Sequence, residues 1–207
     1  MIPALLALED GSIFRGQSIG AQGTTVGEVV FNTAMTGYQE IMTDPSYAGQ
    51  IINFTFPHIG NVGANDEDME TTTPAARGLV LRADITDPSN FRSAQHLDPW
   101  LKARGLIGVS GIDTRQLTRR IRDSGAPHGV VAHAPDGMFD IAALTALAAG
   151  WSGLTGLDLA KTVSCTQSYS WNETAWALGE GYGALDANDA RYHVVAVDFG
   201  AKYNILR

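Results

Sequence analysis

The sequence predicts a mixed α/β (α+β) protein with one domain over residues 1–150. Short β-rich runs bounded by Gly and Pro fill the first half of this span, and strands alternate with helical patterns in its second half. After residue 150 the regular patterning is lost, and it returns only near residue 193. We therefore expect a connector over residues 151–190 and the truncated start of a second domain over residues 191–207.

The expected strands of the first domain begin with a hairpin over residues 4–15, because an Asp-Gly turn signal separates two apolar runs there. Residues 28–33 (EVVFNT) form the next β-rich run. In residues 50–56 (QIINFTF) apolar and polar side chains alternate, which predicts a half-buried strand with Asn53 on its polar face. Further short strands are expected at residues 77–83, 106–110 and 129–133.

Three helices are expected in the first domain. Residues 97–104 place apolar side chains at i, i+3 and i+4, which is typical of an amphipathic helix. Asp113 is the predicted N-cap of a helix over residues 114–123, and Asp140 is the predicted N-cap of a helix over residues 141–149. A glycine shortly after each pattern predicts where each helix ends.

The last residues follow a different pattern. Residues 193–198 (HVVAVD) are almost continuously apolar, a Phe-Gly turn follows, and residues 201–207 begin a helical pattern. A strand, a turn and a helix in this order are typical of the opening of a doubly wound parallel sheet. A strand of such a sheet needs neighbours, so we expect a truncated domain. The alternative is a complete, non-catalytic interaction module.

The charge and composition of the chain argue against several classes of partner and cofactor. The net charge is −8, with 14 basic against 22 acidic residues, which argues against nucleic acid or an anionic membrane as a partner. The N-terminus lacks the basic residues of a signal peptide, and the chain has a single cysteine. These features predict a cytoplasmic protein without disulfides. Neither the His spacing nor the acidic loop around residue 67 matches a metal site, so no metal or cofactor is expected in this chain.

Four collinear blocks of the sequence are long and particular: residues 27–63, 108–131, 156–164 and 194–207. The longest block reads GEVVFNTAMTGYQEIMTDPSYAGQIINFTFPHIGNVG. Together the blocks closely resemble the small subunit of carbamoyl-phosphate synthetase, and the similarity extends over the whole chain.

This resemblance implies a three-layer β/β/α "swivelling" domain, followed by the first strand, turn and helix of a class I glutamine amidotransferase domain. It implies a parent protein that hydrolyses L-glutamine and passes ammonia to a large subunit. The large subunit uses ATP and Mg²⁺ to make carbamoyl phosphate for pyrimidine and arginine biosynthesis. The family's catalytic Cys, His and Glu would lie beyond Arg207, so the chain alone is expected to dock onto the large subunit without glutaminase activity.

Two residues are candidates for glutamine binding by this resemblance. Ser46 lies in the loop TDPSYAGQ, which the family places beside the bound glutamine, although Asp44 and Ser46 could simply bond local backbone. Lys202 follows the predicted strand at 193–198, at the end where open α/β sheets bind ligands. Its ammonium could pair with the substrate carboxylate, or it could be a solvated lysine in the first turn of a helix.

Two other features have less specific explanations. Cys165 has no glycine elbow or helix start beside it to lower its pKa, so it is not expected to be the nucleophile. Arg115, Arg119 and Arg122 are spaced to form one basic stripe on the helix over residues 114–123. Such a stripe is commonly a solvated face, and the alternative is electrostatic docking onto another subunit or domain.

Overall fold

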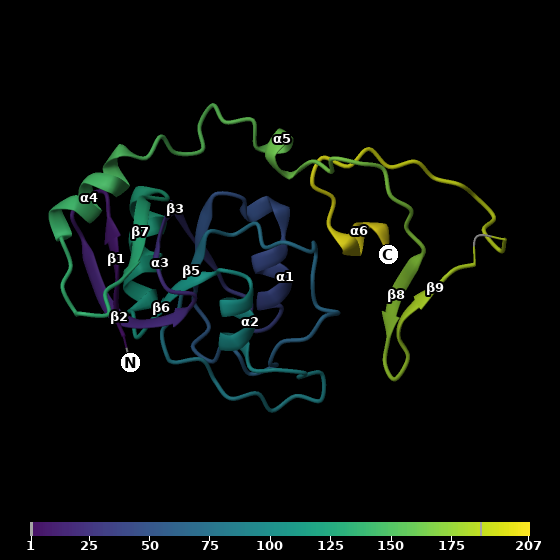
Figure 1. Ribbon diagram of the computed structural model, residues 1–207, viewed down its shortest axis with the longest axis horizontal. Helices are drawn as coiled ribbons and strands as arrows, with labels where there is room; N and C mark the ends of the chain where they lie inside the picture. Colours follow the sequence, from purple (N-terminus) through teal and green to yellow (C-terminus); the bar gives the residue numbers. More distant parts are fainter. Residues whose placement is uncertain (1, 187) are drawn as a thin grey trace.

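The computed structural model describes residues 2–186 and 188–207; Met1 and Ala187, which fall in the predicted first domain and connector, lie outside the described residues. Seven strands close into a barrel in the order β1-β2-β6-β5-β4-β3-β7 (Figure 1). Strands β3, β4, β5 and β6 run parallel to one another, and β1, β2 and β7 complete the barrel with antiparallel pairings. Their bounds are β1 Pro3–Leu8, β2 Ile13–Gly20, β3 Thr24–Asn32, β4 Gln50–Phe54, β5 Gly78–Val80, β6 Ile107–Ser110 and β7 His128–His133.

Alternate residues of the strands fill the barrel interior. Leu6 of β1, Val29 of β3 and Val131 of β7 belong to one buried apolar cluster, as the two-residue period of a strand requires. Helix α3 (Thr114–Ser124) joins the same cluster through Leu117 and Ile121, so it closes one end of the barrel.

The outer face of the barrel is covered by three other helices. Helices α1 (Tyr38–Thr43) and α2 (Leu97–Ala103) pack on the parallel strands, and Trp100 of α2 is fully buried there. Helix α4 (Ile141–Gly150) covers β1 and β7 on another side (Figure 1). The mixed α/β class predicted from the sequence is therefore confirmed.

Strand β4 corrects one prediction, because it is buried on both faces rather than half-buried. Asn53 points into the barrel with no exposed surface, and its Nδ2 donates to the carbonyl oxygen of Thr114 at 3.1 Å and to Oγ1 of Thr118 at 2.9 Å. The polar residue in this alternating pattern, Asn53, therefore faces α3 and not solvent.

The helix starts follow the sequence prediction closely. The side chain of Asp113 accepts a hydrogen bond from the backbone N–H of Gln116, and Asp140 accepts one from Ala143. All three helix ends differ from the prediction by one residue: α2 ends at Ala103 rather than at residue 104, α3 at Ser124 rather than at 123, and α4 at Gly150 rather than at 149.

Residues 151–207 form an extended segment that we call the C-terminal arm. After α4 the chain runs along the barrel to the side of α1, where a hairpin and a last short helix lie (Figure 1). The arm contains helix α5 (Leu159–Val163), strands β8 (Glu173–Ala177) and β9 (Gly181–Ala184), and helix α6 (Tyr203–Leu206). The β8–β9 hairpin lies in the predicted connector, where no regular structure was expected.

The strand predicted at residues 193–198 is not formed. Val194, Val195 and Val197 are 81%, 80% and 75% exposed, and none belongs to a strand. A parallel-sheet strand is stabilised by its neighbours, and within the described chain no strand pairs with this segment. The helix expected over 201–207 is shortened to the four residues of α6.

Candidate functional site

Ser46 lies in a short turn between α1 and β4. Pro45 cannot continue α1, because its ring excludes the helical conformation for the residue before it. Asp44 is nearly buried, and its Oδ1 accepts a hydrogen bond from the backbone N–H of Ser46 at 2.8 Å, which starts a single 3-10 turn over Pro45–Tyr47. The Ser46 side chain itself is exposed to solvent.

Lys202 reaches the same carboxylate from the arm. Its Nζ donates to Oδ2 of Asp44 at 3.0 Å, although the two residues are 158 positions apart in the chain. This hydrogen bond to Asp44 raises the pKa of Lys202, and the negative charges of Asp44 and Glu70 add to the effect. Lys202 is therefore a firmly cationic group, and the two oxygens of Asp44 join it to the Ser46 turn.

The residues after Lys202 are bound by Glu70, from the loop between β4 and β5. The Glu70 carbonyl oxygen accepts from the N–H of Tyr203 at 3.0 Å. Its carboxylate accepts from the backbone N–H of Asn204 at 3.0 Å and from the Asn204 side chain at 2.8 Å. Two neighbouring loops of the barrel domain thus contact three consecutive residues of the arm.

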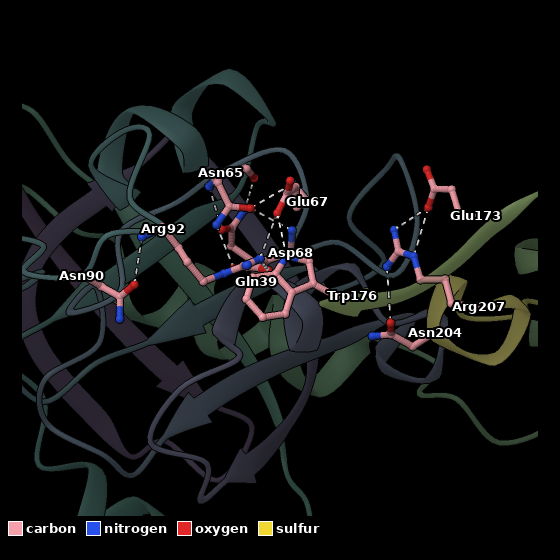
Figure 2. Close-up of polar contacts among 10 residues, drawn as sticks. All are labelled: Gln39, Asn65, Glu67, Asp68, Asn90, Arg92, Glu173, Trp176, Asn204 and Arg207. Carbon is pink, nitrogen blue, oxygen red and sulfur yellow. Dashed lines mark hydrogen bonds and ion pairs between the residues drawn. The ribbon is translucent and has the colours of Figure 1, made fainter. Parts of the chain in front are cut away.

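The β8–β9 hairpin makes a second set of contacts with the same loop (Figure 2). Trp176 Nε1 donates to Glu67 Oε2 at 3.1 Å, and the Arg92 guanidinium lies 4.5 Å from the centre of the Trp176 ring. Arg92 also pairs with Asp68, and this hydrogen bond raises its pKa.

The end of the described chain is held by the hairpin. Arg207 Nε donates to Glu173 Oε2 at 3.0 Å, and its guanidinium lies 3.6 Å from the centre of the Tyr182 ring. Figure 2 shows the contact between Arg207 and Glu173. The Arg207 side chain is only 7% exposed. Residues of α6 and its C-cap, Arg207, therefore contact the barrel domain through Glu70 and the hairpin through Glu173.

Acidic groups dominate this junction. Burial raises the pKa of Glu40 to about 7, and the nearby charges of Asp68 and Glu70 add to the shift while Arg92 opposes it. Glu40 lies in the first turn of α1, where the charges of Asp68, Glu70 and Arg92 act on it. The junction therefore contains a carboxyl group that titrates near neutral pH.

The other residues considered in the sequence lie elsewhere. Cys165 is exposed, and its Sγ is 3.9 Å from the carbonyl oxygen of Asp198. Arg115, Arg119 and Arg122 form an exposed face of α3, where Arg122 pairs with Asp123. An open pocket of about 360 Å³ between β2 and α2 contains neither Ser46 nor Lys202.

Two absences apply to residues 2–186 and 188–207. No three His, Cys, Asp or Glu side chains gather there in a way that could hold a metal ion. In that same part of the chain, no helix has both the length and the apolar character needed to cross a membrane.

Sequence reasoning missed two residues that organise this site. Asp44 was considered only as a turn residue, and the Asp-Pro-Ser pattern does predict its bond to Ser46 but not its second oxygen's bond to Lys202. Glu70 lies in the acidic loop around residue 67, which was considered only as a metal site and rejected, yet Glu70 is 7% exposed. No local pattern could reveal Glu70, because its partners come from the arm.

The geometry first defines a class: an α/β barrel domain with an arm that brings a lysine to a loop carboxylate, forming one side of a polar site. The family model described as "Carbamoyl-phosphate synthase small chain, CPSase domain" matches residues 6–131. The chain belongs to this family.

Curated relatives named carbamoyl phosphate synthase small chain match nearly the full chain. Those from Rhizobium meliloti strain 1021 and Agrobacterium fabrum strain C58 are each 62% identical over 208 residues, covering 99% of this chain and 52% of the relative. The relative from Ruegeria pomeroyi is 59% identical over 204 residues, with 99% and 52% covered. The chain thus spans about half the length of these relatives.

A solved structure, an aminopeptidase from Aneurinibacillus sp. strain AM-1, matches with a TM-score of 0.33 and 11% identity, covering 65% of this chain and 31% of the aminopeptidase. A likeness this low supports no conclusion about fold or function.

Proposed function

We propose that this chain is part of a glutamine-hydrolysing small subunit, and that Ser46 and Lys202 form one wall of its glutamine site. The observation that supports this most directly is that both residues bond the same carboxylate. Asp44 accepts from the Ser46 N–H through Oδ1 and from Lys202 Nζ through Oδ2. Two segments far apart in sequence, each implicated by family resemblance, therefore meet at one point.

The chemistry of these groups suits glutamine. An ammonium has three donors, and Asp44 occupies one of those of Lys202. The others can pair with the α-carboxylate of an amino acid, and the exposed Ser46 hydroxyl can donate to or accept from the same ligand. Such contacts bind substrate but do not break its amide bond, so we assign Ser46 and Lys202 a binding role and not a catalytic one.

The whole protein would act with a partner. Relatives named as a small chain imply a large subunit. We propose that this large subunit receives ammonia from glutamine hydrolysis and uses ATP and Mg²⁺ to form carbamoyl phosphate for pyrimidine and arginine biosynthesis in the cytoplasm. The barrel domain would dock onto it, and neither nucleic acid nor a membrane would be a partner.

The layered β/β/α description is compatible with a flattened barrel. The parallel strands β3 to β6, with α1 and α2 outside them, would form one β layer and the helical layer. The antiparallel strands β1, β2 and β7 would form the other β layer.

The direct test is substitution of Lys202 in the full-length small subunit paired with its large subunit. Lys202→Met should raise the KM for glutamine about tenfold or more while leaving ammonia-dependent synthesis unchanged, since only glutamine uses this wall. Lys161→Met, on α5, is the matched control because it removes an exposed lysine from the same arm. An unchanged KM in Lys202→Met would contradict the proposal.

A second test uses the 207-residue chain itself. We expect it to bind the large subunit and to hydrolyse no glutamine, because no catalytic residue is assigned to it. The mixture should make carbamoyl phosphate from ammonia. Hydrolysis of glutamine by the isolated chain would refute this assignment, and failure to bind would show that the docking surface lies elsewhere.

A further inference from the structure

Glu70 joins the barrel domain to the arm through both its side chain and its backbone. Although it is an ionisable residue in a loop, it is 7% exposed, and both of its carboxylate oxygens accept hydrogen bonds from Asn204. Its carbonyl oxygen accepts a third, from Tyr203. Burying a carboxylate is costly unless its oxygens are bonded, so these partners fix the position of Glu70.

Glu70 is in turn tied to the helix that precedes the Ser46 turn. Its backbone N–H donates to Oγ1 of Thr43 at 2.9 Å, and that hydroxyl donates to the carbonyl oxygen of Gln39 at 2.8 Å. Thr43 is the last residue of α1, is fully buried and directly precedes Asp44. Both the loop that binds the arm and the turn that contains Ser46 are therefore held at the C-terminal end of α1.

At the start of α6, no side chain at the N-cap position makes a capping hydrogen bond. The N-cap is Lys202, and its side chain cannot cap the helix because an ammonium has no acceptor for backbone N–H groups. It donates to Asp44 instead. The N–H groups of Tyr203 and Asn204, which a cap would normally satisfy, are satisfied by Glu70 instead. On the other side of Lys202, Asp198 accepts from the N–H groups of Gly200 and Ala201.

We propose that Glu70 is a positioning residue for glutamine binding, which supplies the missing cap of α6 and thereby holds the Lys202 ammonium in the site. This inference rests on the proposed function of Lys202. Asp44 alone fixes only the tip of a long, flexible side chain, whereas Glu70 fixes the backbone from which that side chain extends. Without Glu70, Lys202 would sample positions from which it cannot reach both Asp44 and a substrate carboxylate.

The test compares three variants in the full-length small subunit bound to its large subunit. Glu70→Ala should raise the KM for glutamine about tenfold with little change in kcat, because a substrate-binding contact is lost. Glu70→Gln keeps one acceptor oxygen for Asn204 and should recover part of the loss. Asp66→Asn, whose side chain is 94% exposed in the same loop, is the matched control and should leave KM unchanged.

The separation of KM from kcat excludes a purely structural effect. A variant that merely unfolds a fraction of the enzyme lowers the apparent kcat and leaves KM as it was. That pattern in Glu70→Ala, or a KM unchanged by it, would overturn the inference.

The Lys202→Met background separates this inference from the proposed function. If Glu70 acts through Lys202, adding Glu70→Ala to Lys202→Met should raise KM no further. Additive increases would show that Glu70 acts independently of Lys202 and would overturn the inference. If Lys202→Met alone leaves the KM for glutamine unchanged, the proposed role of Lys202 is contradicted, whatever the result with Glu70.

Discussion

The barrel domain and the C-terminal arm are held in place by different forces. In the barrel, apolar clusters fill the interior and the space beneath the outer helices. In the arm, neither α5 nor α6 buries a residue, and the attachments are hydrogen bonds, ion pairs and aromatic contacts. The barrel is thus stabilised collectively, whereas the position of the arm depends on a few named contacts.

This difference has a functional consequence. A packed core is stable because many side chains contribute to its packing. Local polar contacts, in contrast, can break without global unfolding. Lys202 lies on the arm and Ser46 lies on the barrel domain. The order of the candidate site therefore depends on the hydrogen bonds by which Asp44 joins the two residues. Substitutions in the two regions should therefore produce different kinds of damage.

The largest effect should come from the barrel core. Trp100→Ala removes a fully buried indole from beneath α2 and leaves a cavity, which typically costs about 3–5 kcal/mol. Urea unfolding of the 207-residue chain, followed by circular dichroism, should show the midpoint falling with one cooperative transition. A loss below about 1 kcal/mol would contradict the account of this core, since buried aromatic truncations rarely cost so little.

A tryptophan in the arm provides the matched comparison. Trp176→Ala removes the hydrogen bond to Glu67 and the contact with Arg92, neither of which belongs to the barrel core. We expect the urea midpoint to change little and proteolysis within the arm to accelerate, because the hairpin is released locally. Equal loss of stability in both variants would mean that barrel and arm unfold as one unit.

The same division explains what the sequence could predict. Most of the barrel elements were anticipated because their signals are local: alternating apolar residues, an Asp-Gly turn, and the N-caps Asp113 and Asp140. Helix α1 was not predicted, because it has only six residues and no side chain caps its start. The error at Asn53 arose because a polar residue facing a buried helix has the same pattern as one facing water. Closure into a barrel could not be predicted, since it depends on which distant strands pair.

The candidate site was predicted less completely. Ser46 and Lys202 were identified through family resemblance, and no local signal joined them to each other. Glu70 was invisible because its partners Tyr203 and Asn204 are 133 or more positions away, as the 134-residue separation of its bond to Asn204 illustrates. The strand expected at residues 193–198 failed for a related reason: an apolar run forms a strand only where a partner strand is present.

An intermediate effect should come from Glu40, at the boundary of the two regions. Its folded pKa of about 7 lies above the ordinary value of 4.5, so the folded protein holds a proton that the unfolded chain releases. Stability is therefore undiminished below about pH 4.5, falls as pH rises from 4.5 to 7, and stays lower above 7. Glu40→Gln removes this penalty.

We expect Glu40→Gln to raise the free energy of unfolding by about 2 kcal/mol at pH 8 and to leave it nearly unchanged at pH 4.5. Urea titrations at the two pH values measure this difference. Glu180→Gln, which removes an exposed carboxylate from the β8–β9 hairpin, is the matched control. A gain of equal size at both pH values would show that burial of the charge is not the cause.

The smallest effect compares two identical caps. Asp140 caps α4 and Asp158 caps α5, each by accepting a backbone N–H three residues ahead, at 2.9 and 3.0 Å. Removing such a cap typically costs about 1 kcal/mol, but only where the helix belongs to the unfolding unit. Because α4 packs on the barrel and α5 buries nothing, Asp140→Ala should lower the urea midpoint and Asp158→Ala should not. If Asp158→Ala lowers it equally, α5 contributes to the cooperative core, and the division between barrel and arm would have to be placed beyond residue 163.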